Sequence, residues 1–221
     1  SALHELAANT VKIFRVTCVF ECDPPVLIRD HSAATHLYRI AQEAVSNAIN
    51  MPSITAEEAP RLKPFVKLAE CLGAFVGQVT DEPIQEVEVL FDGSTATMNT
   101  KALISAPLAG LIRPQVADVN MVSAPIMAKE RGVMLSEIKR DKSGMFDGYI
   151  KLTVKTANMT RTIAGTCFSD GKPRFIQIKG INLDAEVGRH MLYTTNADAP
   201  GIIGLLGTLC GKHEVNIANF Q

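Results

Sequence analysis

Glu43 and Asn47 are the first residues whose types and spacing could support chemistry. They lie four positions apart in residues 31–50, where apolar residues recur at helical spacing, so both side chains share one face of a predicted helix. A carboxylate and a carboxamide oxygen are hard oxygen ligands of the kind that Mg²⁺ accepts beside phosphate and water. Taken alone, however, the spacing favours a solvated polar stripe over a metal site.

A second set of polar groups lies in and after the turn "NADAPG", residues 196–201. The proline of this turn is predicted to open a helix, whose first backbone amides, from Gly201 and Ile202, would favour an anion. Asp198 could oppose an ammonium group, and Asn216 on the next predicted strand could donate and accept hydrogen bonds. Without other information, Asp198 is more simply explained as the cap of that helix.

The composition of the chain argues against several classes of partner. The 221 residues are 47% hydrophobic with a net charge of −1, which is typical of a soluble globular protein, and no run of like charge predicts a nucleic-acid partner. No apolar stretch approaches the roughly 18 residues of a membrane span, so we expect no membrane partner and a cytoplasmic location. The cysteines and histidines show no metal-ligand spacing, so no metal is expected.

Hydrophobic periodicity predicts a mixed α/β (α+β) chain whose helices and strands alternate. Alternation over residues 14–22 predicts a strand, and residues 31–50 follow as a helix. Thr55 and Glu58, at the spacing of a capping box, open a second long helix that ends near residue 79. The further predicted strands are 85–91, 133–139, 149–155, 162–168, 174–181, one from about residue 190, and 215–220; the further predicted helices are 100–111, 120–131 and one from residue 200.

The stretch "ATHLYRIAQEAVSNAI" resembles the N-box of the sensor histidine kinases of bacterial two-component systems, and this resemblance covers residues 1–49. It implies that Asn47 coordinates the Mg²⁺ of Mg-ATP and that Glu43 lies beside the phosphates. Nothing after Met51 resembles the "DxGxG" box that this family also needs. We therefore expect a vestigial nucleotide site in a strand-helix fragment of an ATPase domain.

From residue 50 onward the chain resembles the D-3-phosphoglycerate dehydrogenase family, NAD-dependent enzymes that open serine biosynthesis. The motifs "NTKALISAPLAGLIRP", "VNMVSAPIMAKERGV", "TIAGTCFSDGKPRFIQIKG" and "HMLYTTNADAPGIIGLLGTLCGKHEVNIANF" carry the resemblance. It implies a connecting helix and linker (50–83), an intervening α+β domain of the allosteric substrate-binding type (84–188), and part of a ferredoxin-like βαββαβ ACT domain (189–221). No GxGxxG motif follows a strand, so we expect no NAD bound by this chain and no catalytic residues in it.

In the resembled ACT domains, positions matching Asn196, Asp198 and Asn216 bind the feedback inhibitor L-serine at a subunit interface. The resemblance therefore implies L-serine as an effector, held by these side chains and by the amides of Gly201 and Ile202, and it implies self-association.

The resembled intervening domain also binds an anion through basic residues. Lys129, Arg131 and Arg174 are the candidates for this role, with solvated surface cations as the simpler alternative.

The tetrapeptide "NAIN", residues 47–50, fits both families. We therefore expect a composite chain in which two partial domains are joined at these residues. The leading hypothesis is a regulatory fragment of a phosphoglycerate dehydrogenase that senses L-serine and associates with itself, without catalytic activity of its own. The alternative is an ATP-binding fragment derived from a histidine kinase. A third outcome is that neither site functions because both domains are incomplete.

Overall fold

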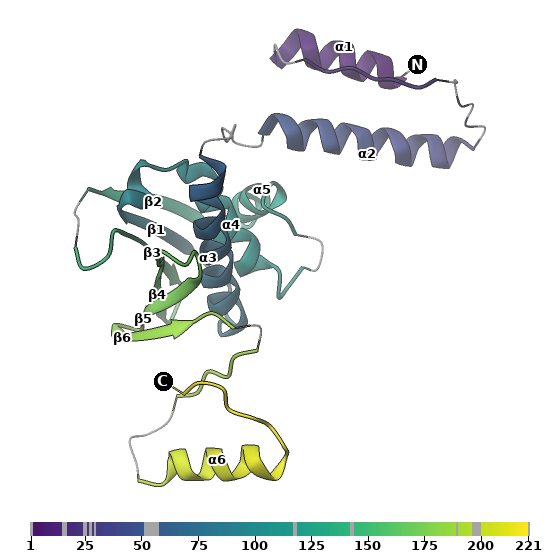
Figure 1. Ribbon diagram of the computed structural model, residues 1–221. Helices are drawn as coiled ribbons and strands as arrows, with labels where there is room; N and C mark the ends of the chain where they lie inside the picture. Colours follow the sequence, from purple (N-terminus) through teal and green to yellow (C-terminus); the bar gives the residue numbers. More distant parts are fainter. Residues whose placement is uncertain are drawn as a thin grey trace.

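The computed structural model describes residues 2–14, 17–23, 26, 28, 30–50, 58–116, 119–141, 144–188, 190–195 and 200–220. Figure 1 shows three parts: a pair of helices at the N-terminal end, a central α/β domain, and a last helix with its flanking segments. The mixed α/β class predicted from the sequence is confirmed. None of the described helices combines the length and the apolar character needed to span a bilayer.

The helical layer of the central domain consists of α3 (Ala59–Gln78), α4 (Thr100–Ile112) and α5 (Ser123–Glu130). Proline in the first turn of α3 fits there because the first amides of a helix have no partner within it. Apolar residues three or four positions apart then form the buried face of the helix, which includes Leu68, Leu72 and Val76. The predicted helix is thus confirmed from Ala59, whereas Thr55 of its predicted capping box lies outside the described residues.

A six-stranded sheet with the order β2-β1-β3-β4-β5-β6 forms the second layer. Strands β1 and β2 are parallel, joined through α4 and α5, and each other neighbouring pair is antiparallel. The bounds are β1 (Glu86–Gly93), β2 (Met134–Arg140), β3 (Gly148–Lys155), β4 (Thr160–Cys167), β5 (Pro173–Ile178) and β6 (Ile181–Glu186).

The last predicted strand of this domain, 174–181, is in fact a hairpin. Ile178 pairs with Ile181 across a two-residue turn in which Lys179 has φ 49 and Gly180 has φ 81. Two successive positive φ angles match the tight turn whose twist suits antiparallel strands, and glycine adopts such a φ without steric cost. The chain therefore reverses at this point and forms β6.

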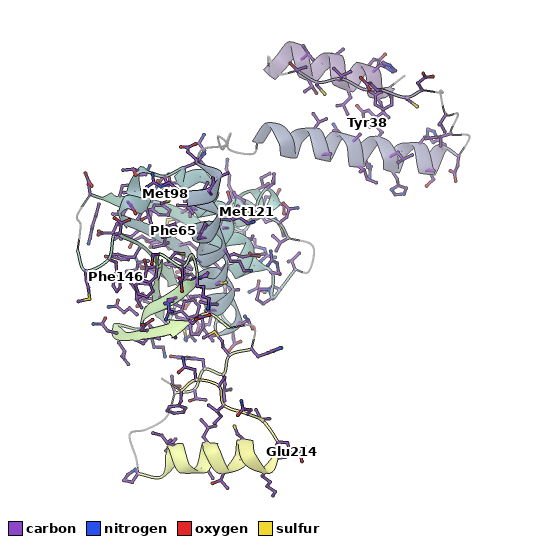
Figure 2. All side chains as sticks on the ribbon, in the orientation of Figure 1. Tyr38, Phe65, Met98, Met121, Phe146 and Glu214 are labelled. Atoms are coloured by element: carbon purple, nitrogen blue, oxygen red, sulfur yellow. The ribbon has the colours of Figure 1, made fainter. Side chains whose placement is uncertain are left out.

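The core lies between the sheet and the helical layer. Val87, Val89 and Phe91 alternate along β1 on its buried face, and Phe91 is fully buried (0% exposed). Their partners on β3, which include Leu152 and Ile150, are buried as well. In Figure 2 Phe65 lies within this dense packing of side chains between α3 and the sheet.

The N-terminal pair consists of α1 (Ala2–Phe14) and α2 (His31–Asn50), which run side by side in Figure 1. The helix predicted over 31–50 is confirmed, but the strand predicted over 14–22 is wrong: α1 ends at Phe14, and residues 17–23 form no strand. A strand requires a neighbour to complete its hydrogen bonds, and no strand of the described sheet pairs with this segment. Its aromatic side chain packs on α1 instead, with the rings of Phe20 and His4 5.0 Å apart.

The last helix, α6 (Ile202–Lys212), confirms the helix predicted after the turn, and no side chain on it is buried. The described residues on either side, 190–195 and 213–220, are not paired into a sheet. The strands predicted there lack a partner strand, because the sheet of the central domain ends at β6. Within residues 190–195 and 200–220, which the structure describes, the helix is the one element expected of a ferredoxin-like unit that is formed.

Candidate functional site

A cavity of about 690 Å³ opens where α3, α4 and α5 end. Its walls are the last turn of α3, the C-terminal half of α4 with the residues after it, the end of α5, and the chain that leads into β1 and β2. The volume falls within the roughly 300–1,000 Å³ range of small-molecule sites. This cavity is therefore the first candidate for a binding site in the central domain.

Arg131 enters the cavity wall because of the way α5 ends. The amide of Gly132 donates to the carbonyl of Lys129 at 3.0 Å, and the amide of Val133 donates to the carbonyl of Ala128 at 2.9 Å. These two bonds close the helix around Gly132, whose φ of 72 suits glycine. Arg131 is thereby fixed as the C-cap residue of α5, three positions before β2 begins at Met134.

The guanidinium of Arg131 is oriented by a residue from another element. Its Nη1 donates to Oε1 of Gln115, which follows α4, at 3.0 Å. Among the described ion pairs Arg131 has no carboxylate partner. Lys129, predicted from the sequence as a companion, is exposed on the same helix but does not line the cavity.

Two carboxylates, Asp81 and Glu82, line the wall that leads into β1. Oε2 of Glu82 accepts from Oγ1 of Thr156 at 2.5 Å, and Oε1 accepts from Nδ2 of Asn158 at 3.2 Å. The hydrogen bonds from Thr156 and then Asn158 hold the pKa of Glu82 below its ordinary value of 4.5. This carboxylate is therefore ionised at neutral pH and ties the segment before β1 to the turn between β3 and β4.

Arg174, the third predicted anion-binding residue, lies elsewhere. It is on β5, separated from β2 by three strands of the sheet. Its guanidinium forms ion pairs with Asp170, Asp184 and Glu186 and stands 5.1 Å from the centre of the Phe168 ring.

Lys129, Arg131 and Arg174 therefore stay predicted candidates for anion binding, in surroundings that differ from one residue to the next. Arg174 already faces three carboxylates, whose charge opposes a further anion. Of the three, Arg131 is the one that lines the cavity.

The structure describes some of the predicted serine-binding residues and not others. Gly201 is the N-cap of α6 with a φ of 92, its carbonyl accepts from the amide of Leu205 at 2.9 Å, and Ile202 is the first helical residue. Asn216 follows the helix and is exposed. Asn196 and Asp198 lie outside the described residues. The helix start predicted at this turn is thus present, while its proposed ligand contacts stay a prediction.

Glu43 and Asn47 both fall within α2, as predicted, and their side chains lie outside the described part of the molecule. In the described part, no group of three or more histidine, cysteine, aspartate or glutamate side chains could hold a metal ion.

The sequence analysis missed Gln115, Asp81 and Glu82 as members of a site. The segment "TDEP", residues 80–83, has the composition of a linker, and no spacing along the chain connects it with Gln115 or Arg131. The only local signal was the pair of adjacent carboxylates in a turn. The cavity arises from tertiary contacts, so sequence patterns could not have outlined it.

Comparisons with known proteins match this domain to a family. Residues 61–179 match the model of the D-3-phosphoglycerate dehydrogenase intervening domain. D-3-phosphoglycerate dehydrogenase of Bacillus subtilis is 33% identical over 92% of this chain and 44% of its own length. The enzymes of Synechocystis and Archaeoglobus fulgidus are each 33% identical over 79% of this chain, and over 32% and 33% of their own lengths. The chain spans less than half the length of these relatives.

The comparisons give no support to the resemblance of residues 1–49 to histidine kinases. These residues make up more than a fifth of the chain, so an alignment over 92% of it must include part of them. The expected boundary between two families near residues 47–50 therefore finds no support either. By the match over 61–179 and the similarity to these relatives, the chain belongs to the D-3-phosphoglycerate dehydrogenase intervening-domain family.

Proposed function

We propose that the chain is a regulatory part of a D-3-phosphoglycerate dehydrogenase, in which residues 189–221 bind L-serine and mediate self-association. Family membership over 61–179 supports the first part, and β6, the turn and α6 come after the matched region in the chain. The observation that carries the proposal for L-serine is the helix start at Gly201, which follows the turn "NADAPG".

The ligand chemistry suits an amino acid. Gly201 is the N-cap of α6 and Ile202 its first residue, and backbone amides at the start of a helix favour a ligand carboxylate. A carboxylate at Asp198 would pair with the ligand ammonium group, and the carboxamide of Asn216 would serve the serine hydroxyl. In this proposal Asn196 contributes a further polar contact from the same turn.

Self-association is supported by the apolar surface around α6. Leu205 is 68% exposed and Ile203 is 66% exposed, and apolar side chains of the segment after the helix are exposed too. Contiguous exposed apolar side chains mark surfaces that another chain covers. We assign NAD to other parts of the longer enzyme, since this chain carries no glycine-rich dinucleotide motif.

Calorimetric titration with L-serine tests the proposal. The chain should give saturable heat that Asp198→Ala and Asn216→Ala reduce about tenfold or more in affinity, because each loses a contact to a charged or polar group of the ligand. Lys212→Ala, on the same helix but at its other end, is the matched control and should bind normally. Absence of heat with the unaltered chain, or equal binding by all variants and by D-serine, would contradict L-serine sensing at this turn.

A further inference from the structure

We propose that the cavity at the ends of α3, α4 and α5 is a second ligand site, which binds a zwitterionic α-amino acid with an apolar side chain. The proposal goes beyond the function proposed above and does not rest on it, because the two sites share no residue and lie on different elements. Three features of the cavity wall carry it: one oriented cation, two carboxylates on another wall, and an apolar floor.

Arg131 provides the carboxylate-binding end. A guanidinium has five N–H donors in a planar fork that matches a carboxylate. Gln115 occupies one nitrogen, Nη1, and so orients the fork without neutralising it. None of the described ion pairs includes Arg131, and in this proposal its remaining guanidinium nitrogens donate to a ligand carboxylate.

Asp81 and Glu82 favour a zwitterion over a simple anion as the ligand of this cavity. With Arg131 they give the lining one positive and two negative charges, so a plain anion would be opposed by the net charge of the wall. Glu82 is held ionised by Thr156 and Asn158, so its charge persists at neutral pH. Because both oxygens of Glu82 already accept from Thr156 and Asn158, which do not line the cavity, Asp81 is the carboxylate that pairs with a ligand ammonium group in this proposal, while Arg131 pairs with the ligand carboxylate.

Gln78 and Thr80 are further polar residues of the lining, whereas the floor of the cavity is apolar. It is formed by side chains of α4 and by the first residues before β1 and β2, namely Ile84, Leu108, Leu111, Ile112 and Val133. Leu108 and Leu111 belong to the buried core, so the floor is shaped before a ligand arrives. Such a floor favours ligands whose apolar surface it removes from water. This favours leucine-like or phenylalanine-like side chains over small polar ones.

The test uses the whole chain and three related probes: L-leucine, 4-methylpentanoate, which lacks the ammonium group, and isoamylamine, which lacks the carboxylate. We expect saturable binding of L-leucine in a calorimetric titration and at least about tenfold weaker binding of either partial ligand. Arg131→Gln and Asp81→Asn should each weaken L-leucine binding about tenfold or more. Lys129→Gln removes an exposed cation from the same helix outside the lining and should leave binding unchanged.

Several outcomes would overturn the proposal. One is the absence of saturable heat with L-leucine and L-phenylalanine up to about 10 mM, which corresponds to a negligible affinity. Another is equal binding of 4-methylpentanoate, and a third is an unchanged affinity in Arg131→Gln. If that variant does not fold, as judged by circular dichroism, Asp81→Asn and Gln115→Leu provide the same comparison. Asp198→Ala separates the two proposals, because it should abolish L-serine binding and leave L-leucine binding intact.

Discussion

Gly73 of α3 lies directly against the backbone of Pro107 in α4, so closely that a Cβ atom on Gly73 would stand well under 3.0 Å from the Pro107 carbonyl oxygen. Gly77, one turn later, meets the carbonyl oxygen of Leu111 in the same way, and Gly110 of α4 meets the backbone of Glu70. Glycine at these positions allows the two helices to pack backbone to backbone. This contact fixes the helical layer on which both the core and the cavity depend.

The variant Gly73→Ala should therefore destabilise the central domain strongly. Its new methyl group meets backbone atoms that cannot move independently, so we expect a loss of about 3 kcal/mol or more in the free energy of unfolding, measured by urea denaturation. Gly204→Ala in α6 is the matched control, because nothing lies within 4 Å of a Cβ there and alanine is the better helix former. Equal losses in the two variants would refute the close packing of α3 on α4.

Stability should fall in acid partly through Glu82. The hydrogen bonds from Thr156 and Asn158 lower the pKa of its carboxyl group in the folded chain below the ordinary value of 4.5. A carboxyl with a lowered folded pKa contributes stability above the unfolded pKa and loses it as the pH falls through the folded pKa. The urea midpoint of the chain should therefore drop below pH 4.5, and Glu82→Gln should show a smaller drop.

Glu130→Gln serves as the control in this pH series, since Glu130 is an exposed carboxylate at the end of α5. It should follow the pH profile of the unaltered chain. If Glu82→Gln and Glu130→Gln had the same profile, the hydrogen bonds of Glu82 would not be the cause of the acid sensitivity.

Arg174→Gln should lower stability and leave the cavity unaffected. It removes the cation shared by Asp170, Asp184 and Glu186, and the remaining carboxylates repel each other. Because the cluster is partly exposed, with 24% of the Arg174 side chain accessible, we expect a loss of about 1 kcal/mol. The loss should shrink at high salt, which screens exposed charges. Lys67→Gln, which removes a single ion pair with Glu70, should show a smaller effect in the same denaturation assay.

The cysteines should differ widely in reactivity. Burial, with the nearby carboxylate of Asp170 and the thiol of Cys71, raises the pKa of Cys167 to about 12, and burial likewise raises the pKa of Cys71. Because the thiolate is the nucleophile, both should react slowly with an aromatic disulfide reagent at about pH 8, whereas exposed Cys22 reacts at once. Cys22→Ser should remove the fast phase. Fast labelling of Cys167 in the folded chain would contradict the burial described here.

The apolar side chains of α6 should drive self-association. Leu205→Asp places a charge at an exposed apolar position and should lower the mass measured by sedimentation towards that of one chain. Thr208→Asp adds the same charge at an exposed polar position of the same helix and should retain the larger mass. A monomeric mass for the unaltered chain at high concentration would refute association through this surface.

The sequence by itself determined most elements of the central domain, with the division of β5 from β6 as the exception. The alternation of Val87, Val89 and Phe91 predicts the central strand, and the helical spacing of Leu68 and Leu72 predicts α3; the structure confirms both. These patterns are local. A period of two residues in a strand, or of 3.6 residues in a helix, predicts which face of the element is buried, and it does so without knowledge of the element that packs against that face. The motifs of residues 50–221 also identified the family correctly.

Pairing between strands was decided by the tertiary structure. Residues 17–23 have the alternation of a strand yet remain unpaired, as do the segments that flank α6, because a strand exists only where a neighbour completes its hydrogen bonds. The turn at Lys179 and Gly180 divides the single strand predicted over 174–181 into β5 and β6 for a related reason: antiparallel pairing accommodates their positive φ angles.

For the candidate sites, too, the sequence gives the residue types and the tertiary structure decides their surroundings. Arg131 and Arg174 carry the same charge in the sequence, and nothing local separates their roles. The fold surrounds Arg174 with three carboxylates, whereas it places Arg131 beside Gln115 in a cavity with an apolar floor. The environment of a charge is set by residues distant in the chain, so only the tertiary structure could decide which cation is available to a ligand.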